Sequence, residues 1–157
     1  MSRETKEKVC TFFVSDYHFE MVSLPYINKK LEEDEDVIVL TENNLEDTMQ
    51  VLLSKMNFKE ERKNKILSIN WKNDDFEKFK EIKRKVENEN KLTIFVKGKE
   101  NYISNISENI KSWIRNSKKV KVIDCYDMEE VGSNIDTVMA SYKSILSTSG
   151  EKEIEKL

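Results

Sequence analysis

The sequence is short of the residues that build the commonest nucleotide-binding loops. It has only three glycines in 157 residues, and Gly98, Gly132 and Gly150 stand far apart from one another. Loops that cradle phosphates need clustered glycines, because the backbone must approach the ligand without side chains in the way. The segment after the first apolar run, SDYHFEM, has neither a glycine nor a lysine. The sequence therefore argues against a P-loop nucleotidase and against a dinucleotide-binding fold with a GxGxxG motif.

Cysteine and histidine are equally scarce. The two cysteines, Cys10 and Cys125, lie far apart and form no CxxC pair, and His18 is the only histidine. These counts argue against a disulfide scaffold, a zinc site or a histidine-based metal centre, so we expect no metal and no cofactor. Ser15, Asp16 and His18 are near neighbours in the chain, but the side chains of a hydrolytic triad rarely converge from a single turn.

Long hydrophobic runs are missing as well. No apolar stretch approaches the roughly 18 residues that a membrane-spanning helix needs. The charged start MSRETKEK does not have the pattern of a secretory signal peptide. We therefore expect a cytoplasmic protein that has no membrane partner.

Charge is abundant but uneven along the chain. Residues 1–58 carry 6 basic and 12 acidic side chains, whereas residues 59–99 carry 13 basic and 8 acidic ones. A basic middle third leaves weak nucleic-acid binding open as one hypothesis. The charges there alternate in sign, as in FEKFKEIKRKVENENK, which is typical of the solvated face of a helix. This pattern favours a solvent-exposed surface over direct nucleic-acid binding.

What the sequence does contain is a repeated switch between two hydrophobic periods. Short, β-rich apolar runs alternate with stretches in which apolar residues recur every three or four positions. The stretches with the longer period predict helices, and the last of these helices is predicted to run from Ile135 to Leu146. The short runs predict five strands, at residues 9–14, 36–41, 65–71, 91–97 and 119–126.

This alternation predicts one α/β domain over residues 1–157, with a core of about residues 9–148 and charged tails. It favours a mainly parallel five-stranded sheet with helices on both faces, which is a three-layer α/β/α sandwich. The charged segment 57–64 has little to bury and is the predicted movable element. Pro25 lies within the first predicted helix, where we expect a kink or a restart.

The candidate site follows from the position of the strand ends. Ligands of an open parallel sheet bind outside the carboxyl ends of its strands. Aromatic rings with polar tips, which are common in small-molecule pockets, occur at the carboxyl ends of the predicted strands. A phosphoacceptor domain is not favoured, because Asp16 is a single acid and Asn70 stands where an aspartate would be needed. The candidate ligand-binding residues are Asp16, Tyr17, His18, Asn43, Trp71, Lys97, Tyr126 and Asp127.

The order of these segments resembles the MEDS family, the methanogen and methylotroph sensory domain. The opening KVCTFFVSDYHFEMVSLPYINKKLEEDEDVIVLTEN is similar to the start of that family, and the closing VIDCYDMEEVGSNIDTVMASYKSIL is similar to its last strand and helix. The resemblance implies a core like that of the RecA and KaiC ATPases, here without a phosphate-binding loop. It also implies a sensory role. The matching positions are Cys10, Phe12, Pro25, Tyr26 and Leu31 in the first segment and Cys125, Tyr126 and Asp127 in the second.

The sequence thus favours a non-enzymatic sensory or regulatory domain in signal transduction or transcriptional control. Its partner is expected to be a small-molecule ligand or a regulatory protein, such as a kinase or a transcription regulator. An enzyme that acts on a nucleotide or another phosphorylated substrate is the alternative, with Lys72, Lys97 and Lys99 supplying positive charge. Homo-oligomerisation through an apolar helix face is also open.

Overall fold

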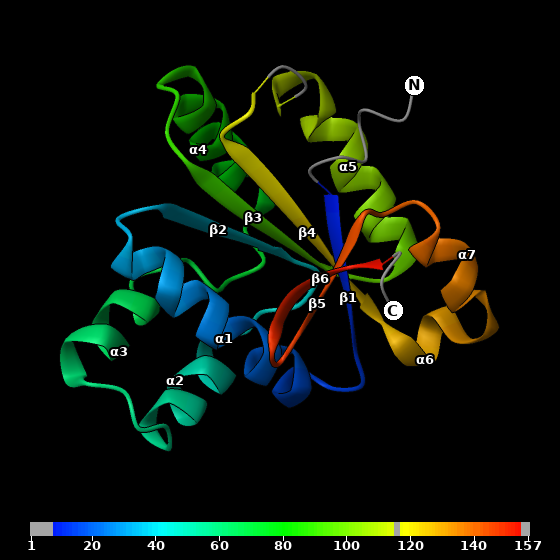
Figure 1. The fold of residues 1–157 in the computed structure, drawn as a ribbon. Helices are drawn as coiled ribbons and strands as arrows, with labels where there is room; N and C mark the ends of the chain where they lie inside the picture. The colour runs from blue at the N-terminus through cyan, green and yellow to red at the C-terminus, as the bar shows by residue number, and fades with distance from the viewer. Residues whose placement is uncertain (1–7, 115–116, 155–157) are drawn as a thin grey trace.

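The computed structural model describes residues 8–114 and 117–154 of the chain. Its centre is a six-stranded sheet with the strand order β2-β3-β4-β1-β5-β6 (Figure 1). Strands β1 to β5 run parallel, and β6 pairs with β5 in the antiparallel direction. The strands are β1 (Lys8–Phe13), β2 (Asp36–Thr41), β3 (Leu92–Gly98), β4 (Val120–Asp127), β5 (Ser144–Ser147) and β6 (Gly150–Glu153).

Helices cover both faces of this sheet (Figure 1). One face carries α1 (Asp16–Glu32), α2 (Glu46–Ser54) and α3 (Glu60–Leu67). The other face carries α4 (Asp75–Glu87), α5 (Glu100–Ile114), α6 (Met128–Val131), a 3-10 turn (Gly132–Asn134) and α7 (Ile135–Met139). The α/β class is confirmed, and the layers fit a three-layer sandwich. None of the described helices has the length and apolar character that crossing a membrane requires.

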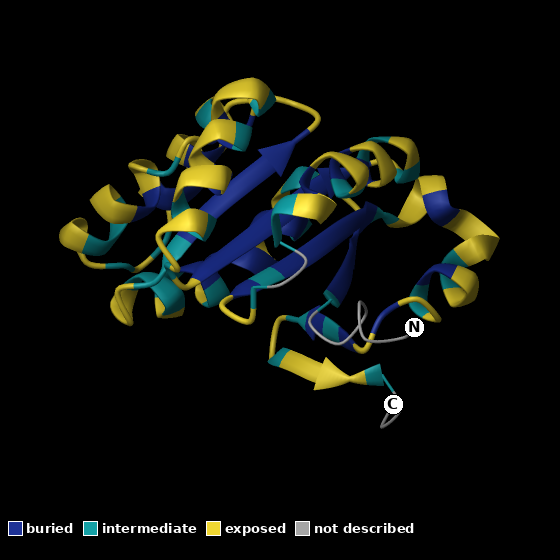
Figure 2. Ribbon diagram, turned by 90° about the horizontal axis from the view of Figure 1, so that it is seen from above, coloured by how far each residue is buried: buried dark blue, intermediate teal, exposed yellow. Residues whose placement is uncertain are grey.

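Each central strand buries both of its faces, because successive side chains of a strand point in opposite directions. In β1, Val9 and Phe13 join the hydrophobic core beneath α1 and α2, whereas Cys10 and Phe12 join the core beneath α5 and α7. Every residue of β3 is buried. Figure 2 shows the central strands as buried and β6 as largely exposed. The continuous apolar runs of the sequence are therefore strands with a hydrophobic core on each side.

The predicted strand at residues 65–71 is wrong. Helix α3 continues to Leu67, so the start of this segment is helical and the rest is a loop. Five charged residues precede Ile66, the one buried residue of α3, and this pattern suits a short helix resting on the core. The loop is fixed by the Trp71 indole, which donates to the Ile66 carbonyl at 2.8 Å, and by Lys78, which donates to the Lys72 carbonyl. The 57–64 segment, predicted to be movable, includes the first half of α3.

The end of the chain also departs from the prediction. The helix expected from Ile135 to Leu146 ends at Met139, and residues 144–147 form β5 beside β1. The four-residue strand is too short for a clear period in the sequence, but it buries Ser144 and Leu146. The Thr11 hydroxyl donates to the Leu146 carbonyl at 2.7 Å, which ties β5 to the sheet. Residues 150–153, which were expected to belong to the charged C-terminal tail, form β6, so the described part of the chain forms a sheet of six strands rather than five.

The shortage of glycine shows at the ends of two helices. Asp34 and Glu89 have φ values of 59° and 58°, in the left-handed region that favours glycine. After α4, the Glu89 amide donates to the Val86 carbonyl and the Asn90 amide donates to the Lys85 carbonyl. The same paired bonds follow α1 around Asp34. Both helices therefore end in a Schellman motif without its usual glycine. Pro25, by contrast, lies inside α1, which continues on both sides of it.

Candidate functional site

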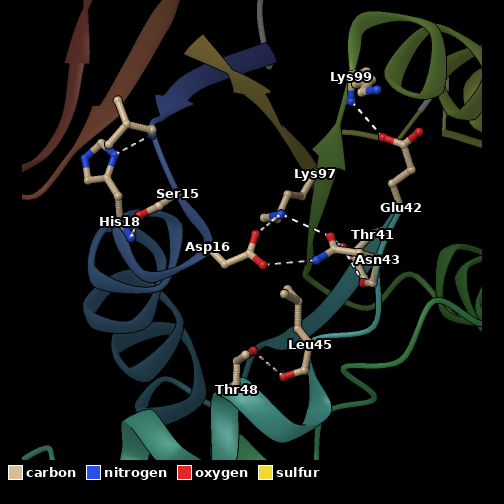
Figure 3. A network of polar contacts seen from close by, with 11 residues as sticks. Ser15, Asp16, His18, Thr41, Glu42, Asn43, Leu45, Thr48, Lys97 and Lys99 are labelled. Atoms are coloured by element: carbon tan, nitrogen blue, oxygen red, sulfur yellow. Dashed lines mark hydrogen bonds and ion pairs between the residues drawn. The ribbon is translucent and has the colours of Figure 1, made fainter. Parts of the chain in front are cut away.

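Three predicted residues from distant parts of the chain meet at the carboxyl edge of the sheet (Figure 3). Asp16 begins α1 just after β1, Asn43 follows β2, and Lys97 lies near the end of β3. They come together because parallel strands place their carboxyl ends at one edge. We call this group, Asp16, Asn43 and Lys97, the edge cluster.

The edge cluster is a closed triangle of polar contacts. The Lys97 Nζ donates to Asp16 Oδ1 at 2.8 Å and to Asn43 Oδ1 at 3.2 Å. The Asn43 amide donates in turn to Asp16 Oδ2 at 3.1 Å. Thr41 donates its hydroxyl to the Asn43 carbonyl at 2.9 Å, which fixes the turn that carries Asn43. Every side-chain nitrogen of the cluster thus points at an acceptor within it.

The two charges of this cluster have very different exposure. The Lys97 side chain is 4% exposed, whereas that of Asp16 is 40% exposed. The Lys97 ammonium lies 4.5 Å from the centre of the Phe13 ring and 5.4 Å from that of Phe19, so aromatic faces replace part of its water shell. The cation is therefore fixed inside the protein, while its anionic partner reaches it from the solvent side.

A second acid lies close to the edge cluster. Glu20 is one turn after Asp16 in α1, is only 2% exposed, and has no hydrogen-bond partner for its Oε2. Burial, aided by the Asp16 charge, raises the pKa of Glu20, and Thr48 and Lys97 oppose this shift. Glu20 was not among the site residues predicted from the sequence. The spacing of Asp16 and Glu20, four residues apart on one helix face, is the signal that indicates it.

The start of α5 at the same edge is occupied by the protein's own carboxylates. Glu42 accepts from the Lys99 amide at 2.9 Å, and Glu130 accepts from the Glu100 amide at 3.2 Å. Helix N-termini attract anions, and here side chains fill that role. Gly98 makes the close approach possible, because a Cβ there would lie 2.7 Å from Glu42 Oε1 and from a ring carbon of Tyr102. The isolated glycine thus has a packing role.

Three other predicted site residues lie at this edge but outside the edge cluster. The ring of Tyr17 is exposed in the first turn of α1. His18 accepts at Nδ1 from the Val14 amide at 3.0 Å, and its own amide donates to the Ser15 hydroxyl, so it closes the turn between β1 and α1. Asp127 caps α6 by accepting from the Glu129 amide at 3.0 Å.

The last two predicted site residues are buried. Trp71 lies in the core beneath α1 and α2 at 2% exposure. Tyr126 lies in the opposite core, where its hydroxyl is 2.5 Å from that of Tyr142. Tyr142 donates to Asp124 Oδ2, also at 2.5 Å. The structure therefore brings Asp16, Asn43 and Lys97 together and separates Trp71 and Tyr126 from them. Asp124 and Tyr142 were not among the predicted site residues, although an acid within an apolar strand is a signal of a polar site.

Both thiols are buried in the sheet. Burial raises the pKa of Cys10 to about 12, and the Asp124 charge adds to this effect. The pKa of Cys125 is raised as well, chiefly by burial. Within residues 8–114 and 117–154, the side chains of histidine, cysteine, aspartate and glutamate form no group of three or more that could hold a metal ion.

Chemically, the edge cluster pairs a buried cation with a half-exposed carboxylate. Comparisons of the chain with models of known protein families, with curated protein sequences and with solved structures find no significant match.

Proposed function

We propose that this chain is a non-enzymatic, cytoplasmic regulatory domain that binds an anionic group at the edge cluster. The anion is a carboxylate or phosphate of a small ligand, or an acidic side chain of a protein partner. The observation that carries this proposal is the mismatch in exposure between Lys97 and Asp16, which are 4% and 40% exposed and 2.8 Å apart. A buried cation needs an anionic partner, but that partner need not belong to the chain.

The geometry supports an exchange of partners. Lys97 cannot turn toward solvent, because its side chain is buried and its ammonium lies against the Phe13 and Phe19 rings. An entering anion would accept from the Lys97 ammonium. It would also accept from the Asn43 amide, which now donates to Asp16. Asp16 loses little by leaving, since its carboxylate regains water.

In this proposal, release of Asp16 changes a surface that a partner protein can recognise. Asp16 is in the first turn of α1, next to a group of exposed apolar side chains. A ligand changes output only through its different affinity for two states, so the state without the Asp16–Lys97 contact must differ at the surface. In this proposal the start of α1 differs, and a regulatory protein, such as a kinase or transcription regulator, recognises it. The exposed group is Val14, Tyr17 and Met21.

The resemblance to the MEDS family supports this role, since it implies a RecA- or KaiC-like core used for sensing rather than for phosphate-loop chemistry. The mostly parallel sheet with helices on both faces is compatible with such a core. The carboxylates that fill the α5 N-terminus also favour a non-phosphate-loop function, since Glu42 and Glu130 compete with any phosphate for those amides.

The test is calorimetric titration with acetate, citrate, inorganic phosphate, ATP and GTP at constant ionic strength. We expect at least one of these anions to bind to the wild-type protein, and its affinity to fall at least about tenfold in Lys97→Met, because a charge-assisted contact is lost. The control is Lys55→Met, which removes the charge of an exposed lysine at the end of α2 and should leave affinity unchanged.

Two results would overturn the proposal. One is that no anion in the panel binds to the wild-type protein, and the other is that Lys97→Met and wild type bind equally well. Turnover of ATP or GTP that disappears in Lys97→Ala would establish the enzymatic alternative instead. Of the lysines invoked for that alternative, Lys72 is 3.9 Å from Glu46 and Lys97 is paired with Asp16.

A further inference from the structure

The face of the sheet opposite α1 holds a groove that the edge cluster does not use. It lies between α5, the length of β4 and the segment that follows α7, and its volume is about 550 Å³. Cavities of this size hold small organic molecules. We call it the α5 groove.

One part of the groove wall is apolar. Ile103 and Ile110 line it from α5, Val122 lines it from β4, and Val138 lines it from α7. All four are at most 9% exposed, so they belong to the rigid core rather than to a mobile surface. This wall suits an alkyl or aryl body, whose burial is favourable by about 25 cal/mol per Å² of apolar area.

The polar part of the groove contains a directed chain of hydrogen bonds. Tyr142 has a single hydroxyl proton and donates it to Asp124 Oδ2 at 2.5 Å. Its contact with Tyr126, also at 2.5 Å, must therefore be donated by Tyr126. Both phenolic protons are therefore donated within this chain of hydrogen bonds. Tyr126 and Asp124, which both line the groove, are left with acceptor capacity only.

The charges around the groove also favour a ligand that is a cation and a hydrogen-bond donor. Glu100, Glu108 and Asp124 line it together with Lys8 and Lys111, which leaves one more acid than base. Asp124 itself is 2% exposed, and burial raises its pKa to about 6, so it is ionised at neutral pH. An ionised carboxylate in a partly apolar groove is complementary to a cation that also donates hydrogen bonds.

We propose that the α5 groove binds a small organic amine, with its protonated amino group at Asp124 and Tyr126 and its apolar body against Ile103, Ile110 and Val138. This site is independent of the edge cluster and has the opposite charge preference. The two sites lie in the same sheet, where Gly98 on β3 pairs in register with Tyr126 on β4.

The test uses three probes of equal length, hexylamine, hexanol and hexanoate, in calorimetric and NMR titrations at neutral pH. We expect hexylamine to bind about tenfold more tightly than hexanol, which is the usual gain from a charge-assisted hydrogen bond. Hexanoate should bind least. Asp124→Asn keeps the shape of the side chain and should abolish the preference for the amine, while Lys55→Met, which removes an exposed charge at the end of α2, should preserve it.

Two further measurements keep the test valid if Asp124→Asn fails to fold. Ser107→Phe places a large ring on the half-buried groove side of α5 and should block all three probes. In the wild-type protein, hexylamine affinity should fall as pH drops through about 6, because Asp124 is then protonated. The other titratable groups around Asp124 are Lys8 and Cys10 on β1, Cys125 and Tyr126 on β4, Glu100 on α5 and Tyr142.

Different results would overturn the amine assignment and the location of the site. Equal binding of hexylamine and hexanol, or an amine preference that survives in Asp124→Asn, would overturn the amine assignment. Unchanged binding in Ser107→Phe would overturn the location. Failure of anion binding at the edge cluster has no bearing on this result.

Discussion

The edge cluster and the α5 groove each contain a buried charge, but the two charges are compensated in opposite ways. At the edge cluster the buried ion is the Lys97 cation, and it is neutralised by a full ionic partner, Asp16, that is 40% exposed. In the groove the buried ion is the Asp124 carboxylate, which is stabilised by the neutral hydroxyl of Tyr142 and more distantly by Lys8. One site has a half-exposed counter-ion in direct contact, and the other lacks a counter-ion in direct contact.

This difference predicts which way each site responds to a ligand. Exchange at the edge cluster replaces one anion by another, so the free energy of binding is the small difference between two ion pairs. Binding in the groove adds a counter-ion to a carboxylate that burial has made costly to ionise. Of the charged residues at the two sites, Asp124 should therefore have the strongest influence on how the free energy of unfolding depends on pH.

The largest expected effect is on the pH dependence of folding. The pKa of Asp124 is raised from 3.8 to about 6 in the folded protein, so the folded state binds this proton more tightly than the unfolded chain does. Its contribution to stability is complete below about pH 3.8 and is lost as pH rises through about 6, a loss of about 3 kcal/mol. Asp124→Asn has no such proton to lose.

Urea denaturation at about pH 4 and about pH 7.5 checks this prediction. Relative to wild type, Asp124→Asn should gain about 2 kcal/mol between the two conditions, because the unfolded chain is already partly ionised at about pH 4. The matched control is Asp136→Asn, an exposed acid in α7, whose difference from wild type should change by less than about 0.5 kcal/mol. A difference between wild type and Asp124→Asn that does not change with pH would contradict the assigned ionisation.

The second prediction tests the asymmetry inside the edge cluster. Asp16→Asn leaves the Lys97 cation buried without its ionic partner, whereas Lys97→Met leaves a half-exposed carboxylate that water can solvate. We expect Asp16→Asn to lower the free energy of unfolding by about 2 kcal/mol and Lys97→Met by about 1 kcal/mol. Chemical denaturation of both single variants and of the double variant measures the coupling. Equal costs for the two variants, or a larger cost for Lys97→Met, would contradict the exchangeable-partner view.

The third prediction separates the two sites by a packing change. Gly98→Ala places a Cβ 2.7 Å from Glu42 Oε1 and from the Tyr102 ring, so Glu42 must move from the Lys99 amide. We expect a loss of about 1–2 kcal/mol in stability, as is usual for overpacking. Anion affinity should fall, because Glu42 adjoins Asn43, whereas hexylamine affinity should not change. Parallel titrations of the variant with both probes give the answer, and a loss confined to hexylamine would refute the separation.

The sequence predicted those parts of the fold whose apolar runs are long and continuous. β1 to β4 are runs such as VIVL and TIFV, and their hydrophobic cores on both faces give an unambiguous pattern. The segments that failed are shorter or mixed. Residues 65–71 largely alternate apolar and polar residues, yet residues 65–67 end α3 and residues 68–71 form a loop. Residues 144–147 are too few to show a period. Tertiary contacts decide the structure of such segments.

Some residues of the candidate site could likewise be predicted from the sequence, and others could not. The strand-end rule brought together Asp16, Asn43 and Lys97, because it depends on parallel strands and not on side-chain detail. It could not tell that Trp71 follows a helix instead of a strand. Nor could it find Asp124 and Tyr142, which meet from a strand and a segment 18 residues later. Their meeting depends on how the chain after α7 returns to the sheet.

The smallest expected effect lies far from both sites and serves as their common reference. Glu89 has a φ of 58° after α4, a conformation that costs a non-glycine residue about 1–2 kcal/mol. Glu89→Gly removes that strain but gives the unfolded chain more freedom, so we expect a net gain in stability of about 0.5 kcal/mol. The residue lies before the amino end of β3, so anion and hexylamine affinities should both stay at their wild-type values. Denaturation and the two titrations measure this, and a change in either affinity would show that the sites respond to global stability and not to their own charges.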